Sequence, residues 1–144
     1  MSDSAGFQFV DTNILVYAHD VSAGDKHERA KKLIVELWHS GKGCISIQVL
    51  QELYVTIGQK ISRPISPEIT SQIIASLAEW RLHIPQIRDL LDAIEIHQRF
   101  KISFWDALII CSAMKLGCEL IWTEDLSSGQ DFEGVKALNP FIGD

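Results

Sequence analysis

The 144-residue chain lacks several features that would place it in a common class of protein. No run of apolar residues approaches the roughly 18 that are needed to cross a bilayer. The start of the chain, MSDSAGFQFVD, has neither the basic region nor the long apolar core of a secretory signal. We therefore expect a cytoplasmic protein that makes no contact with a membrane.

Cysteine is scarce, and the three cysteines include no C-x-x-C pair. This odd number and irregular spacing argue against a disulfide framework and against a zinc knuckle. Cys111 lies in the apolar run ALIICSAM, where we expect a small buried side chain and not a reactive thiol.

Two further groups of motifs are missing. The chain contains neither G-x-G-x-x-G nor the P-loop pattern, which disfavours nucleotide binding of those kinds. Its five histidines show no H-E-x-x-H motif, which disfavours a zinc hydrolase. The net charge of −6 disfavours a simple basic nucleic-acid-binding module, but it is compatible with a nuclease whose acids hold metal ions.

The sequence does contain an alternation of short strands and amphipathic helices, over a length that suits one domain covering residues 1–144. We expect helices at 25–40, 46–59, 67–80, 86–100 and 103–116, and a short helix after Asp11. We expect strands at 7–10, 44–45, 82–84, 119–122 and 135–138. Strands separated by helices indicate parallel crossovers, so the sequence predicts a three-layer α/β/α sandwich with a central parallel sheet.

Four acidic residues occur at positions that would lie near the carboxyl edge of such a sheet. Asp11 directly follows the first expected strand, and Asp125 closely follows the strand expected at 119–122. Ligands of parallel sheets bind outside the carboxyl ends of the strands. Glu52 and Asp106 lie on expected helices that could flank the same edge.

Each of these acids also has an ordinary structural interpretation. Asp11 could cap the helix that follows it, and Asp106, three residues after Ser103, could complete a capping box. Asp125 could form an Asx-turn, and Glu52 lies on a polar helix face where glutamates are normally solvated. Asp106 is informative because its helix is almost wholly apolar, and aspartate resists burial unless it is paired or binds a metal.

Taken together, the four acids suit a site for divalent cations. Mg²⁺ and Mn²⁺ are hard ions that take oxygen ligands, often carboxylates together with water and a substrate phosphate. Four clustered acids without a cation would repel one another, and some would stay protonated. The sequence therefore predicts a metal-dependent site of Asp11, Glu52, Asp106 and Asp125. The neighbouring Glu124 and, above all, Asp131 are rivals for the fourth position.

Four ordered segments carry a resemblance to a known family: FVDTNILVYAHD, ISIQVLQELY, FWDALIICSAMKLGC, and IWTEDL followed by VKALNPF. The sequence resembles PIN-domain proteins, and among them the toxin ribonucleases of VapBC-type toxin–antitoxin modules. The resemblance implies cleavage of RNA with Mg²⁺ or Mn²⁺, a homodimer, and an antitoxin partner. It places the family's four acids on Asp11, Glu52, Asp106 and Asp125, with Asn13 supporting the first acid and with Ser46 and Thr123 lining the site.

Three other functions stay open at this point. A housekeeping PIN nuclease in RNA maturation or decay would share the same site and would lack a neighbouring antitoxin gene. A non-catalytic PIN-like module could use the acidic pocket only to dock a partner, although the complete set of four acids argues against it. An aspartyl phosphatase also carries an aspartate after its first strand, but its usual second carboxylate, two residues on, is here Asn13.

Overall fold

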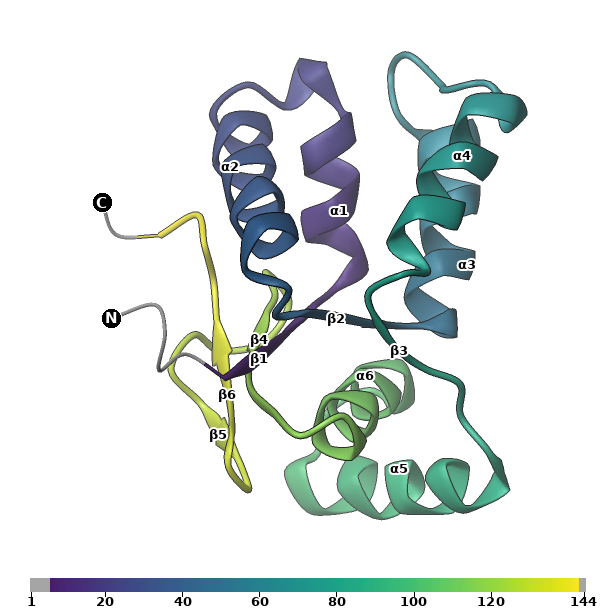
Figure 1. The fold of residues 1–144 in the computed structure, drawn as a ribbon. Helices are drawn as coiled ribbons and strands as arrows, with labels where there is room; N and C mark the ends of the chain where they lie inside the picture. The colour runs from purple at the N-terminus through teal and green to yellow at the C-terminus, as the bar shows by residue number, and fades with distance from the viewer. Residues whose placement is uncertain (1–5, 143–144) are drawn as a thin grey trace.

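The computed structural model describes residues 6–142, which form a six-stranded sheet in the order β3-β2-β1-β4-β6-β5 (Figure 1). Neighbouring strands are parallel, except that β5 and β6 form an antiparallel hairpin. The expected parallel sheet is confirmed. The additional strand β5 was not predicted, because a strand of two residues leaves no recognisable pattern in the sequence. The strands are β1 (Phe7–Val10), β2 (Gly43–Ser46), β3 (Arg81–His83), β4 (Cys118–Trp122), β5 (Asp131–Phe132) and β6 (Val135–Leu138).

Helices cover both faces of this sheet. In Figure 1, α1 to α4 stand on one face, and α5 and α6 lie on the other, which confirms the expected three-layer sandwich. In the described range, no helix is both long enough and apolar enough to cross a membrane. The helices are α1 (Thr12–His19), α2 (Asp25–Ser40), α3 (Ile47–Val55), α4 (Pro67–Leu77), α5 (Ile87–Phe100) and α6 (Phe104–Lys115), with the short turns η2 (Val21–Ala23) and η3 (Thr56–Lys60).

The helix starts follow the local chemistry of the sequence. Asp11, Ser46, Ser66 and Ser103 each accept a backbone N–H with a side-chain oxygen and so begin α1, α3, α4 and α6. The helix predicted over 46–59 differs from expectation, because α3 ends at Val55 and continues as the single π-helical turn η3. Such turns are rare, and they occur frequently beside functional sites.

The centre of the sheet is mostly apolar. Phe9, Val10 and Ile121 lie on β1 and β4 and are completely buried, since helices pack on both sides of these strands. The free thiol of Cys111 is buried on α6, as the sequence predicts. A rigid central pair of strands therefore carries the residues that follow them at the carboxyl edge.

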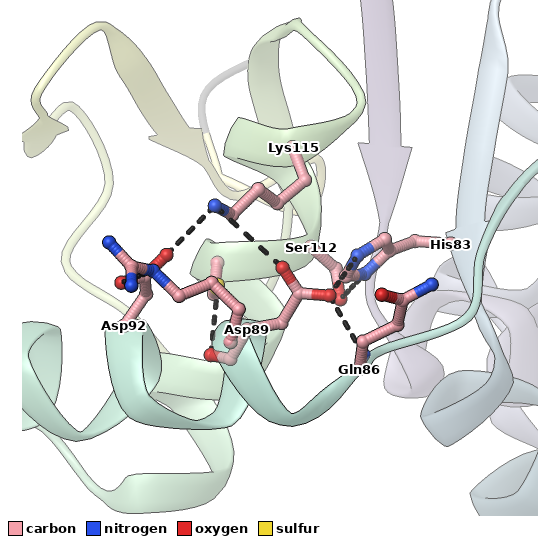
Figure 2. Close-up of polar contacts among 8 residues, drawn as sticks. His83, Gln86, Asp89, Asp92, Ser112 and Lys115 are labelled. Atoms are coloured by element: carbon pink, nitrogen blue, oxygen red, sulfur yellow. Dashed lines mark hydrogen bonds and ion pairs between the residues drawn. The ribbon is translucent and has the colours of Figure 1, made fainter.

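A polar network fixes α5 to the rest of the fold (Figure 2). His83, at the end of β3, contacts the Ser112 hydroxyl through Nδ1 at 2.7 Å and the Asp89 carboxylate through Nε2 at 3.1 Å. Asp89 also accepts the Gln86 N–H at 2.9 Å, which begins α5 with a capping box, and it pairs with Lys115 at 3.7 Å. Because Ser112 is only 1% exposed, this serine, histidine and aspartate tie helices together and do not form an accessible nucleophile.

The N–H of Gln86 is the main reason why the pKa of Asp89 lies below its ordinary value. This hydrogen bond outweighs partial burial, which raises the pKa, and His83 and Lys115 lower it further. A carboxyl group with a lowered pKa stabilises the fold in its ionised form. Asp89 therefore stabilises the fold above the pKa of an unfolded aspartate, and this contribution is lost as the pH falls below it.

Replacing Asp89 by alanine should lower the free energy of unfolding by about 1–3 kcal/mol at neutral pH, because it removes a helix cap and the acceptor for His83. Near pH 3 the difference from wild type should shrink, because an unfolded aspartate, with a pKa of about 4, is then mostly protonated and folding must release that proton. Urea unfolding at the two pH values measures both effects. Asp92→Ala is the matched control, because Asp92 forms surface ion pairs with Arg88 and Lys115. An equal loss of stability in the two variants would contradict the assignment.

Candidate active site

The sheet changes direction between β1 and β4. From β1 the chain builds β2 and β3 on one side, and β4 is then added on the other side of β1. In open α/β sheets, ligands bind in the crevice at the carboxyl ends of the strands at such a switch point. Asp11 follows β1 and Asp125 lies three residues after the end of β4, so both acids belong to this crevice.

Asp11 is the most enclosed of the four acids, with 6% of its surface exposed. The Thr12 N–H donates to one carboxylate oxygen at 2.7 Å, and the Thr123 hydroxyl donates to the other at 2.8 Å. Burial raises the pKa of Asp11 to about 7; the hydrogen bonds from Thr123 and Thr12 lower it, and the carboxylates of Asp125 and Asp106 raise it. The ionised form of Asp11 is therefore destabilised in the folded chain, and a bound cation would stabilise it.

Glu52 reaches the same edge from α3. Its carboxylate accepts the Thr12 hydroxyl at 2.6 Å and the Gln48 amide nitrogen at 3.2 Å. The Gln48 amide also contacts the carbonyl oxygen of Trp105 at 3.4 Å. Glu52 is thus held by neutral donors from α1 and α3, and the solvated interpretation of this glutamate is wrong.

Asp106 lies half-buried in the first turn of α6, and its backbone N–H donates to the Ser103 hydroxyl at 3.0 Å. This cap uses the backbone of Asp106 and leaves its carboxylate available. The carboxylate lies close enough to raise the pKa of both Asp11 and Asp125. The capping and site interpretations of Asp106 are therefore compatible.

Asp125 completes the group from the turn after β4. Both of its carboxylate oxygens accept hydrogen bonds from the Asn13 amide group, at 3.1 and 3.0 Å. The backbone N–H of Asp125 donates to the Thr123 hydroxyl at 3.1 Å. Loss of solvent is the main cause that raises the pKa of Asp125, followed by the nearby carboxylate of Asp106. The resemblance assigned Asn13 to the first acid, whereas in the structure its side chain holds the fourth.

Asp131 and Ser46 have other surroundings. Asp131 is exposed on β5, where one carboxylate oxygen accepts the Gly134 N–H at 3.2 Å within the hairpin to β6. Ser46 is fully buried at the end of β2, and its hydroxyl accepts the Val49 N–H at 3.3 Å to cap α3. Ser46 thus lies at the carboxyl edge but serves the start of the helix that carries Glu52.

A fifth acid, Glu124, is bound in a different way. Its carboxylate accepts the Tyr17 hydroxyl at 2.8 Å and forms an ion pair with Lys26. Partial burial raises the pKa of Glu124, but the hydrogen bonds from Lys26 and Tyr17 outweigh it and keep the pKa below its ordinary value. Sequence reasoning did not find Tyr17 and Lys26, because they are 107 and 98 residues away from Glu124.

The model of the PIN domain family matches residues 9–129, which include Asp11, Glu52, Asp106 and Asp125. The chain belongs to the PIN-domain family. The fold is accordingly that of a PIN nuclease, and the matched residues end before Asp131. Among curated proteins, no sequence relative of the chain is found.

Several solved structures share this PIN fold. VapC20 of Mycobacterium tuberculosis, a toxin that cleaves the sarcin-ricin loop, has a TM-score of 0.61 at 23% identity, over 82% of this chain and 89% of its own. A toxin–antitoxin complex from Klebsiella pneumoniae has a TM-score of 0.67 at 20% identity, over 93% and 98%. FitAB bound to a DNA fragment has a TM-score of 0.71 at 16% identity, over 96% and 98%. At these identities the likeness shows the shared fold alone.

The raised pKa of Asp11 predicts a loss of stability as the pH rises. Between about 4, the pKa of an unfolded aspartate, and about 7 in the folded chain, the folded state binds the proton more tightly. Stability therefore falls through this window and levels off above it. In Asp11→Asn the side chain at position 11 has no proton to lose. The unfolding free energy of the wild type, relative to that of this variant, should therefore fall over the same window.

Urea unfolding with EDTA, repeated from about pH 4 to about pH 8, measures this difference. Asp131→Asn is the control, because Asp131 is exposed on β5 and lies outside the group of four acids. A difference between wild type and Asp11→Asn that does not vary with pH would show that the Asp11 carboxylate is not strained.

Proposed function

We propose that the chain is a metal-dependent endoribonuclease that cleaves RNA phosphodiester bonds and is the toxin of a toxin–antitoxin pair. The observation that carries the proposal is the convergence of four carboxylates at the switch point of the sheet, one of them buried with a pKa of about 7. Neutral donors hold three of these acids and leave their charge uncompensated. Such a set favours a bound cation.

The cation that we propose is Mg²⁺ or Mn²⁺, held by Asp11, Glu52, Asp106 and Asp125. Both ions prefer oxygen ligands, and the four acids supply only oxygen. In residues 6–142, no group of three His, Cys, Asp or Glu side chains forms a ready-made metal site. When bound, the ion would activate water and stabilise negative charge on the scissile phosphate.

The neutral donors give this site its order. Thr12 and Thr123 hold the two oxygens of Asp11, and Asn13 holds Asp125. Partners of this kind orient ligands without cancelling their charge, and metal affinity depends on them. We propose Asp125 and not Asp131 as the fourth acid, because Asp131 already closes the β5–β6 hairpin.

The comparisons support an antitoxin as a partner. The structures that share the fold include a toxin–antitoxin complex from Klebsiella pneumoniae and DNA-bound VapBC from Salmonella typhimurium. VapC20 is described as a toxin that cleaves the sarcin-ricin loop, which supports RNA as the substrate. These likenesses favour a toxin over a housekeeping nuclease.

Cleavage of RNA in the presence of Mg²⁺ or Mn²⁺ tests the proposal directly. Asp11→Asn and Asp106→Asn should each lower the rate about 100-fold or more, because both metal position and charge change. EDTA should abolish cleavage by the wild type. Asp131→Asn is the control and should retain full activity; undiminished cleavage by Asp11→Asn and Asp106→Asn would refute the assigned site.

We also propose that the chain forms a homodimer through α5. Ile87, Leu90, Leu91 and Ile94 are exposed at helical spacing on α5. The first two also line a hollow of about 350 Å³ together with the exposed Trp105. An exposed apolar stripe of this size marks an interaction site. A single stripe along one helix can pack against its own copy about a two-fold axis, which favours a second copy as the occupant.

Leu91→Glu should convert the dimer into a monomer, because it places a charge in the centre of the α5 stripe. Sedimentation velocity of wild type and variant measures the change in mass. Val35→Glu is the matched control, because Val35 is exposed on α2, away from the stripe, and the dimer should persist. A wild type that sediments as a monomer would contradict the proposal.

A further inference from the structure

Glu124 stands between two residues of the candidate site, Thr123 and Asp125, yet its carboxylate is bound by a different layer of the fold. The Tyr17 hydroxyl of α1 donates to it at 2.8 Å, and the Lys26 ammonium group at the start of α2 forms an ion pair with it. The turn after β4 is thereby attached to both helices that cover this part of the sheet.

The Lys26 ammonium group also contacts two aromatic rings. Its nitrogen lies 5.0 Å from the centre of the Tyr17 ring and 5.3 Å from the centre of the Phe141 ring. The two rings contact each other edge to face, with centres 5.2 Å apart. These cation–π contacts add to the attraction of the ion pair and distinguish it from an isolated surface salt bridge. We call Tyr17, Lys26, Glu124 and Phe141 the aromatic clamp.

Three consecutive side chains of the turn are each held by a different partner. Thr123 donates to Asp11, Glu124 is held by the aromatic clamp, and Asp125 accepts from Asn13. Removing the middle attachment would let the turn pivot between its two outer ones. The position of the Asp125 carboxylate therefore depends on a contact that Asp125 does not itself make.

The aromatic clamp also includes a segment outside the part of the chain that matches the family. The matched residues end at 129, whereas Phe141 follows β6 near the end of the described residues. The backbone N–H of Phe141 donates to the Asn139 side chain at 2.8 Å, which fixes the turn that carries the Phe141 ring. The second aromatic contact of Lys26 thus comes from the segment that follows β6.

We propose that Tyr17, Lys26 and Phe141 are positioning residues, which hold Glu124 and so place Asp125 at the metal site. The same contacts keep the Glu124 carboxylate away from the ion. The inference rests on the proposed function for the role of Asp125, and on the contacts described above for the clamp.

Tyr17→Phe is the sharpest variant, because it removes only the hydroxyl group and keeps the ring against Lys26 and Phe141. We expect Mn²⁺ affinity to fall about 3- to 10-fold and kcat for RNA cleavage to fall by a similar factor, with KM nearly unchanged. Titration calorimetry with Mn²⁺ and steady-state cleavage measure these values. Tyr54→Phe, at an exposed position on α3, is the matched control and should match the wild type.

Amide hydrogen exchange gives a readout without metal. In the metal-free protein, exchange in residues 124–130 should become faster in Tyr17→Phe, while exchange in the core strands and the urea midpoint stay unchanged. Lys26→Met should show the same local change. Lys26→Arg should restore most of the wild-type behaviour, since arginine keeps both the charge and the stacking on the rings.

Unchanged exchange, Mn²⁺ affinity and kcat in Tyr17→Phe would overturn the inference. A rise in KM alone in Lys26→Met would also overturn it, because Lys26 would then contact RNA and not position the turn. If the wild type binds Mn²⁺ but does not cleave RNA, only the proposed function fails, and Tyr17→Phe still tests the clamp. If the wild type binds no Mn²⁺, both fail.

Discussion

The burial of the Asp11 carboxylate at the end of the central strand is the constraint on which the rest of the site depends. A carboxylate removed from water is destabilised unless hydrogen bonds or a cation compensate for the lost solvation. Thr12 and Thr123 supply part of that compensation, and the pKa of about 7 shows that it is incomplete. The fold thus retains a strained charge where β1 and β4 end, which is typical of sites that give up stability for function.

The kind of partner separates Glu52 and Asp125 from Glu124 and Asp89. Thr12, Gln48 and Asn13 are neutral donors, and they orient Glu52 and Asp125 without cancelling their charge. Glu124 and Asp89, by contrast, are paired with cationic or ionisable side chains. The first group keeps its negative charge at the site that we propose for a cation, and the second group uses its charge to join elements of the fold.

The two helix layers divide these tasks. The layer of α1 to α4 carries the donors Thr12, Asn13 and Gln48, together with Glu52 and the Tyr17 and Lys26 side chains of the aromatic clamp, while α6 of the other layer supplies Asp106 at its start. The polar network of His83, Ser112 and Asp89 attaches α5 to α6 and β3 (Figure 2). That attachment leaves the outer apolar stripe of α5 exposed.

Local patterns in the sequence determined the alternation of strands and helices, the helix caps, and the two acids with the clearest context, Asp11 after a strand and Asp106 in an apolar helix. These features depend on residues within a few positions of one another, so they can be inferred without the fold. The short strand β5 and the π turn after Val55 left too weak a local signal to be predicted.

Only the tertiary structure decided which acids meet and what holds them. Asn13 and Asp125 are 112 residues apart, and Thr12 and Glu52 are 40 apart. Glu52 therefore looked solvated, Asp131 remained a rival of Asp125, and Tyr17 and Lys26 gave no signal. The physical reason is that parallel strands bring together residues that follow each of them, and the order of the strands is set by packing of the whole chain.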